Sequence, residues 1–209
     1  MAVSFTELTV QQLLDALASP NPTPGGGTGS AVAGAIGTSL LAMVAGLAKS
    51  RNNTGDEKAA LARARERLMP ITTHLAQLAD ADAQSFDAVM AAYRLPKATD
   101  EEKAARTQAI QTALQGATTV PLATLRACAD ALAHARVVAE HGNRSASSDA
   151  GVAIGLLRAA AAGAHANVRT NLDGIKDDAF QAMTGAEAAR LAAAATKEAA
   201  AGMAALDRP

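Results

Sequence analysis

The 209-residue chain has little of three residue types on which many small folds and sites depend. It has a single cysteine, Cys128, which excludes an internal disulfide and a multi-cysteine metal site, so we expect Cys128 to fill a small space in the core. It has no tryptophan, one tyrosine and three phenylalanines, so the core must be built from aliphatic side chains. Its four histidines show no HExxH-type spacing. We therefore expect no metal site.

Strong charge of either sign is also missing. The formal net charge is −1, and no basic run or basic patch with aromatic residues occurs, which argues against a nucleic-acid partner. The segment Met1–Leu8 has neither the basic nor the apolar part of a secretory signal, so the cytoplasm is the expected location. The uncharged run Ala31–Ala48 approaches the length of a membrane span. Its alanine, glycine, Thr38 and Ser39 instead favour a buried central helix and no membrane partner.

Alanine is what the chain has in abundance, with 56 residues. Alanine is the best helix former, and its small side chain lets helices approach closely. No stretch shows the alternating pattern of a strand. The sequence therefore predicts an all-α fold, a bundle of long Ala/Gly-rich helices that forms a single domain over residues 1–209.

Capping residues, prolines and glycines predict where the first helices begin and end. A capping box at Thr9 begins a helix that reaches about Ser19, and the proline- and glycine-rich segment after it ends that helix. The next helix runs to about Ser50, and its internal glycines indicate close packing against another helix. After a turn at Asn52–Gly55, a helical stretch extends to about Tyr93.

Prolines and caps divide the second half in the same way. Pro70 should break or kink the stretch that ends near Tyr93. A capping box at Thr99 begins a helix that ends near Thr118, and Pro121 begins another that ends at Gly142. Ser148 or Asp149 should cap the next helix, which runs to about Leu172; a terminal helix follows over residues 178–206.

The segment Pro22–Gly27 is the first candidate for a functional site. Its prolines fix the chain, and its glycines leave backbone N–H groups open at the start of a helix, where an anion or a carbonyl oxygen binds well. A plain helix–helix connection explains the segment equally well. No Gly-Lys-Ser/Thr follows and no strand precedes, so the segment is neither a P-loop nor a dinucleotide turn.

Asp82 is the second candidate. It lies on an otherwise apolar stripe at helical spacing, formed by Leu75, Leu78, Asp82, Phe86, Val89 and Met90. Partial desolvation there should raise the pKa of its carboxyl group toward the range useful for proton transfer. Asp80 and Asp87 fit an ordinary solvated helix face better.

Two further candidates are polar. The segment from Gly142 to Asp149 contains Asn143 and Ser148, although helix caps account for much of it. Asn167 and Asn171 lie four residues apart on one predicted helix face, where each can hydrogen-bond a ligand or another helix.

These candidates occur in an order that resembles the formiminotetrahydrofolate cyclodeaminase and methenyltetrahydrofolate cyclohydrolase family. The resemblance covers about residues 10–180. It rests on Pro22–Gly27 with the Ala/Gly helix after it, Asp82 with Ser85–Met90, Ala92–Lys97, Thr99–Lys103, Val120–Leu122, Gly142-Asn143, Ser148–Val152, and Asn167 with Asn171-Leu172. It implies an all-helical fold, a homodimer and a folate site near the glycine turn.

The resemblance also implies an enzyme of one-carbon folate chemistry. We expect hydrolysis of 5,10-methenyltetrahydrofolate to 10-formyltetrahydrofolate, with Asp82 as the catalytic general acid/base and Lys97 as its partner. The expected substrate-binding residues are Thr23, Pro24, Gly25, Gly26, Gly27, Asn143, Ser148, Asp149, Asn167 and Asn171. No cofactor beyond the folate substrate is expected. Two alternatives remain: a cyclodeaminase that releases ammonia to give 5,10-methenyltetrahydrofolate, and a non-catalytic helical oligomerisation protein.

Overall fold

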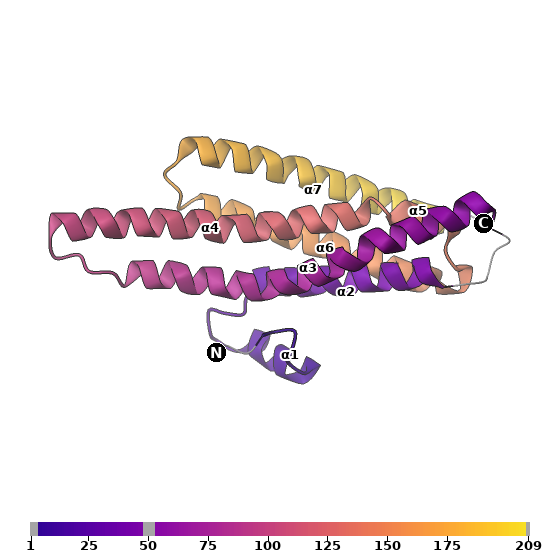
Figure 1. Ribbon diagram of the computed structural model, residues 1–209, viewed down its shortest axis with the longest axis horizontal. Coiled ribbons are helices and arrows are strands. Elements are labelled where there is room, and N and C mark those ends of the chain that lie inside the picture. The colour runs from indigo at the N-terminus through magenta and orange to yellow at the C-terminus, as the bar shows by residue number, and fades with distance from the viewer. Residues whose placement is uncertain (1–3, 48–52, 208–209) are drawn as a thin grey trace.

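The computed structural model describes residues 4–47 and 53–207, and every regular element in these two ranges is a helix (Figure 1). This confirms the predicted all-α fold. A 3₁₀ turn at Arg144–Ala146 joins two of the α-helices. The α-helices are α1 (Val10–Ala18), α2 (Gly26–Gly46), α3 (Gly55–Tyr93), α4 (Asp100–Leu132), α5 (Ala135–His141), α6 (Ser147–Leu172) and α7 (Asp178–Leu206).

Helix α2 packs against both α3 and α6. A β-carbon at Gly34 would lie 2.9 Å from the Sγ of Cys128, and one at Gly37 would lie 2.9 Å from the carbonyl oxygen of Ala153. The glycines inside α2 therefore permit the close helix packing that their size predicts. Within the described part of the chain, α2 is the one helix long and apolar enough to cross a membrane, and here its buried side packs against α3 and α6.

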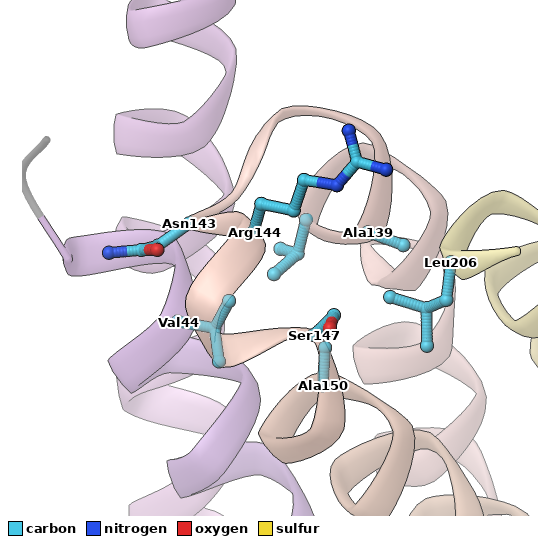
Figure 2. Close-up of a pocket in the computed structure, with 8 residues that line it drawn as sticks. Val44, Ala139, Asn143, Arg144, Ser147, Ala150 and Leu206 are labelled. Atoms are coloured by element: carbon cyan, nitrogen blue, oxygen red, sulfur yellow. The ribbon is translucent and has the colours of Figure 1, made fainter. Parts of the chain in front are cut away.

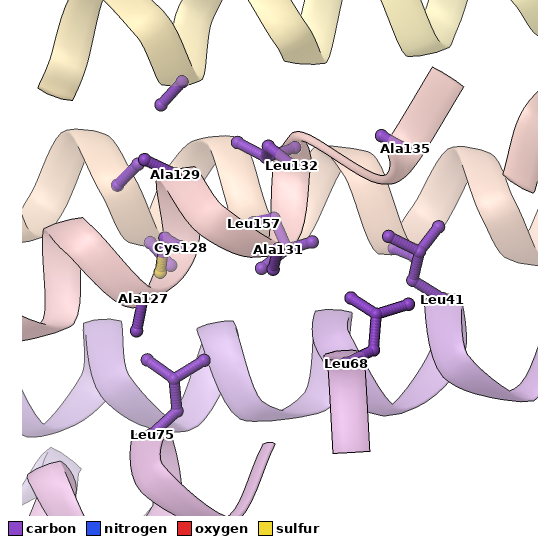
Figure 3. Packing of buried hydrophobic residues seen from close by; sticks show 14 of the residues in the cluster. Leu41, Leu68, Leu75, Ala127, Cys128, Ala129, Ala131, Leu132, Ala135 and Leu157 are labelled. Carbon is purple, nitrogen blue, oxygen red and sulfur yellow. The ribbon is translucent and has the colours of Figure 1, made fainter. Parts of the chain in front are cut away.

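Aliphatic side chains from α2 to α7 form the core, as the shortage of aromatic residues requires (Figure 3). Leu41, Leu68, Leu75 and Leu157 are fully buried in it. Cys128 is also fully buried, and burial raises the pKa of its thiol to about 12. It is the small core residue that the sequence predicts, with little tendency to form the reactive thiolate.

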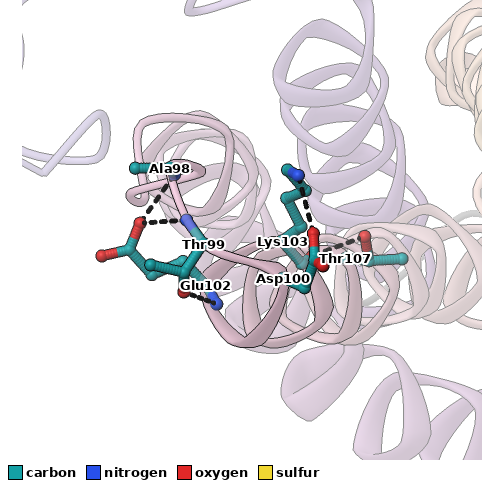
Figure 4. A network of polar contacts seen from close by, with 6 residues as sticks. All are labelled: Ala98, Thr99, Asp100, Glu102, Lys103 and Thr107. Atoms are coloured by element: carbon teal, nitrogen blue, oxygen red, sulfur yellow. Dashed lines mark hydrogen bonds and ion pairs between the residues drawn. The ribbon is translucent and has the colours of Figure 1, made fainter.

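Capping boxes begin three of the helices. Those at Thr9 and Thr99 confirm the predicted starts of α1 and α4, and Thr54 begins α3 in the same way. At the start of α4, the Thr99 hydroxyl accepts the backbone N–H of Glu102, whose carboxylate accepts the backbone N–H of Thr99 (Figure 4). The predicted turn over 52–55 lies partly outside the described residues.

The two internal prolines do not end their helices. Helix α3 continues through Pro70 but changes direction along its length, as a proline kink explains (Figure 1). Helix α4 continues through Pro121, so the predicted end near Thr118 is wrong. Proline at 121 has no N–H for the carbonyl of Ala117. The side-chain amide of Asn171 on α6 donates to that carbonyl instead, at 2.9 Å.

This contact makes Asn171 the structural substitute for a missing backbone hydrogen bond. We expect Asn171→Ala to lower the free energy of unfolding by about 1–3 kcal/mol, because the buried Ala117 carbonyl loses its partner. In a Pro121→Ala background the cost should shrink, since residue 121 then has an N–H for Ala117. Urea unfolding of the two single variants and the double variant measures this. Purely additive losses would contradict the assignment.

The start of α6 differs from the prediction. The helix begins at Ser147 after Ala146, and no side chain caps it, so Ser148 and Asp149 lie in its first turn and neither is the N-cap. The Asn143 side-chain oxygen instead accepts the backbone N–H of Ser145 at 2.8 Å and stabilises the 3₁₀ turn. Gly142 ends α5 as predicted, but the predicted continuous helix up to Gly142 is interrupted between Leu132, where α4 ends, and Ala135, where α5 begins.

Candidate functional site

The glycine turn and Asp82 meet in the structure. Gly25 is the N-cap of α2, and no side chain caps this helix end. Gly27 is buried against α3, where an added β-carbon would lie 2.5 Å from the Cγ of Asp82 and would overlap its oxygens. The carboxylate therefore occupies the space that any other residue at 27 would fill. Gly27 and Asp82 are far apart in the sequence, so only the fold shows this contact. It brings the first two candidates into one site.

Thr28 is a site residue that sequence reasoning missed. It is fully buried, and its hydroxyl donates to the Oδ2 of Asp82 at 3.0 Å. The bond fixes the carboxylate against the first turn of α2. The available sequence signal is the position of Thr28 directly after three glycines, where a short hydroxyl side chain faces whatever the turn approaches.

Opposing effects set the acidity of Asp82. Partial burial raises the pKa of its carboxyl group above the usual aspartate value, and hydrogen bonds from the side chain and backbone of Thr28 counteract part of that shift. Burial prevails. The structure thus gives Asp82 the raised pKa that its place on an apolar stripe predicts, which suits a group that both takes and returns a proton.

Asn167 also reaches this site. A β-carbon at Gly26 would lie 3.7 Å from the Nδ2 of Asn167, and that amide nitrogen donates to the carbonyl of Gly163 in its own helix, α6. Gly26 is exposed and Asn167 is half-buried. The two therefore form an accessible edge beside Asp82. The polar face of α6 continues one turn further to Asn171, whose amide donates a hydrogen bond to the carbonyl of Ala117.

The neighbouring acids behave differently from Asp82. Asp87 is exposed, as predicted. Asp80 accepts hydrogen bonds from the Ser4 hydroxyl and, at 2.7 Å, from the backbone N–H of Phe5. Asp80 therefore holds the segment before α1 onto α3, a role that its sequence position does not reveal.

Lys97 does not accompany Asp82 within one chain. The eleven residues from Asp82 to Tyr93 correspond to about 16 Å of helix. Lys97 is exposed in the loop beyond Tyr93, which extends past the end of α3 (Figure 1). Lys97 therefore does not lie beside Asp82 in a single chain, and its role as the partner of Asp82 stays a prediction.

Asn143, Ser148 and Asp149 lie at the other end of the bundle, where Asn143 and Ser147 share a small pocket with Val44 of α2 (Figure 2). The eighteen residues from Gly26 to Val44 correspond to about 27 Å of helix. The pocket volume is about 40 Å³, which is water-sized and far smaller than a folate. These three residues therefore lie far from the glycine turn in a single chain, and their part in substrate binding stays a prediction.

Asp82 thus stands on α3 against the uncapped N-terminus of α2, with Asn167 of α6 beside them. In the described ranges, no three histidine, cysteine, aspartate or glutamate side chains gather closely enough to hold a metal ion. The fold and the site define a helical bundle in which a half-buried carboxylate lies against a helix N-terminus that no side chain caps, an end that favours negative charge.

Comparison with known proteins gives the family. Residues 9–190 match the model of the formiminotransferase-cyclodeaminase family, and the chain belongs to this family. It is 44% identical to the methenyltetrahydrofolate cyclohydrolase of Methylorubrum extorquens over 172 residues, which are 82% of this chain and 83% of that protein.

Longer relatives and a solved structure match as well. The chain is 32% identical to the formimidoyltransferase-cyclodeaminase of Rattus norvegicus over 87% of its own length but 34% of that protein's. The crystal structure of formiminotetrahydrofolate cyclodeaminase from Thermotoga maritima superimposes with a TM-score of 0.85 and 28% identity, covering 97% of each chain. The relatives are named as enzymes of one-carbon folate chemistry, so the resemblance that the ordered motifs indicate is confirmed.

Proposed function

We propose that the protein hydrolyses 5,10-methenyltetrahydrofolate to 10-formyltetrahydrofolate. The observation that carries the proposal is the half-buried Asp82 carboxylate held against the N-terminus of α2 by Thr28. The 44% identity to a methenyltetrahydrofolate cyclohydrolase, over most of both chains, supports this substrate.

The proposed reaction uses Asp82 twice. The methenyl carbon lies between folate N5 and N10 and is cationic, so it is already electrophilic. Asp82 takes a proton from water while the water oxygen bonds to this carbon, which gives a tetrahedral adduct. The bond from the carbon to N5 then breaks as Asp82 returns its proton to N5, and the hydroxyl proton leaves to solvent as the formyl C=O forms on N10. One proton is released overall.

The remaining groups bind and orient the substrate. Backbone N–H groups at Gly25–Gly27 can hold a pterin carbonyl or a glutamate carboxylate, and Asn167 supplies an amide at the edge of the site. Thr23 and Pro24 shape the turn that precedes them. We propose that no metal or further cofactor takes part, because the substrate itself supplies the positive charge. The cytoplasm is the proposed location.

A cyclodeaminase is the alternative, and the match to the Thermotoga maritima structure favours it. In that reaction N10 attacks the formimino carbon on N5 and ammonia leaves, which gives 5,10-methenyltetrahydrofolate. Both reactions pass through a tetrahedral carbon that carries nitrogen, so the same acid/base group serves either.

The absorbance of the methenyl-folate chromophore tests these functions. With 5,10-methenyltetrahydrofolate we expect the band to decay much faster with the protein than in buffer. Appearance of the band from 5-formiminotetrahydrofolate would instead identify the cyclodeaminase. No change with either substrate would leave the non-catalytic oligomerisation protein and overturn the proposal.

We further propose a homodimer. Several large apolar side chains on α2 are partly exposed, among them Ile36 at 49% and Met43 at 39%. A self-complementary contact across a two-fold axis would cover such a face.

A further inference from the structure

Helix α1 is amphipathic, and the rest of the described chain covers its apolar face only in part. Val10, Leu13, Leu14 and Leu17 form one face at helical spacing, yet no residue of α1 is buried. Val10 is 75% exposed and Leu14 is 55% exposed. Figure 1 shows α1 standing apart from the bundle. A nine-residue helix is marginal alone in water, so its apolar face requires a surface to pack on.

A matching surface lies between α2 and α3. It is a groove of about 420 Å³ lined by Met43, Leu47, Met69 and Arg65, with smaller side chains between them. Met43, Leu47 and Met69 are 39%, 40% and 51% exposed. Three large flexible apolar side chains around one groove suit the apolar face of a short helix.

The chain's own α1 is held away from this groove. On one side, Ser4 and Phe5 are hydrogen-bonded to Asp80. On the other side, seven residues (19–25) join α1 to the start of α2, and fully extended they span about 24 Å. Met43 lies about 25 Å along α2 from Gly26. Leu14 lies four residues, or about 6 Å of helix, before the end of α1, so even an α1 aimed at its own groove would need most of the extended length of this connection.

We propose that α1 of a second copy of this chain occupies the groove, and that the exchange is reciprocal. A two-fold axis near Ile36, at the middle of α2, places the partner's glycine-turn end beside this chain's Met43 end. The partner's α1 then meets the groove, and this chain's α1 meets the partner's groove. Both unpartnered apolar faces are covered by one symmetric contact.

Charge supports a second copy rather than a lipid surface. Residues 4–24 contain Glu7 and Asp15 but no lysine or arginine, whereas Arg65 lines the groove. Helices that lie on anionic membranes are typically rich in lysine and arginine on their polar face. The acidic α1 segment therefore complements the groove and lacks the charge that favours a membrane.

Disulfide trapping tests the exchange. The variants Leu14→Cys and Met43→Cys, each with a different affinity tag, are co-expressed and oxidised, and the native thiol of Cys128 stays inert because it is buried. We expect a cross-linked species of twice the chain mass that carries both tags. The matched control pairs Asp15→Cys, on the polar face of α1, with Met43→Cys, and should give much less.

The double variant Leu14→Cys/Met43→Cys separates exchange from packing within one chain. Reciprocal exchange gives a covalent dimer on a non-reducing gel, whereas an intrachain disulfide leaves the monomer mass and overturns the proposal. Absence of any cross-link also overturns it. In sedimentation, Leu14→Glu should weaken the dimer by about ten- to a hundred-fold, and Gln11→Glu should not. No folate is present, so these outcomes do not depend on the proposed activity.

Discussion

Asp82→Asn is expected to lower the turnover of 5,10-methenyltetrahydrofolate by about 10²–10⁴-fold, the usual contribution of a general acid/base. Asparagine keeps an oxygen that accepts the Thr28 hydroxyl but cannot take a proton. The initial rate at which the methenyl absorbance falls, measured at saturating substrate, gives the change in kcat. The matched control is Asp87→Asn, which alters an exposed carboxylate on the same helix and should leave turnover unchanged.

The pH profile gives a second readout. Because burial raises the pKa of Asp82, the ionised base should be lost above the ordinary aspartate range, and the rate should fall as the pH drops through that raised value. This acidic limb should disappear from the residual activity of Asp82→Asn. Turnover like that of the unmodified protein, with the limb intact, would remove Asp82 from the acid/base role.

The stability of the fold should depend on pH in the opposite sense to the rate. A raised carboxyl pKa in the folded state favours folding at low pH, and that contribution is lost as the pH rises through the folded-state pKa. Near neutral pH the ionised Asp82 therefore disfavours the folded state, and Asp82→Asn should unfold no more easily than the original protein. Loss of turnover with retained stability would separate chemistry from folding.

Local signals in the sequence predict the helix starts well, because a capping box is made within four consecutive residues. Thr9 and Thr99 illustrate this. The proline at 121 shows the limit of local signals. Its effect depends on Asn171, fifty residues away in sequence, which compensates the missing hydrogen bond and keeps α4 continuous.

The site shows the same division between local and tertiary information. An acid on an apolar stripe and three glycines before a helix are visible in the sequence, and the two features do meet. Which end of a long helix each motif occupies is not visible, so the sequence groups Lys97 and Asn143 with Asp82. A helix of about twenty residues is about 30 Å long, and packing direction then decides which motifs share a site. The place of Thr28 directly after three glycines is visible too, but its role depends on the tertiary contact with Asp82, which the sequence does not show.

Gly27→Ala is expected to damage both the fold and the chemistry. The new β-carbon would overlap the Asp82 carboxylate, so that side chain must shift and its hydrogen bond to Thr28 must lengthen or break. We expect the free energy of unfolding to fall by about 1–3 kcal/mol, the usual cost of overpacking. Turnover should fall on the order of 10²-fold, because displacement of about 1 Å is enough to misalign a catalytic group.

Gly29→Ala is the matched control, since it lies in the same helix with open space where its β-carbon would be. It should stabilise the protein by about 0.5–1 kcal/mol and leave turnover unchanged. Urea unfolding and the chromophore assay measure both variants. If Gly27→Ala behaves like Gly29→Ala, the carboxylate is not held against the turn. If Gly27→Ala acts through Asp82, the double variant Gly27→Ala/Asp82→Asn should have little less turnover than Asp82→Asn alone, because both changes disable the same group.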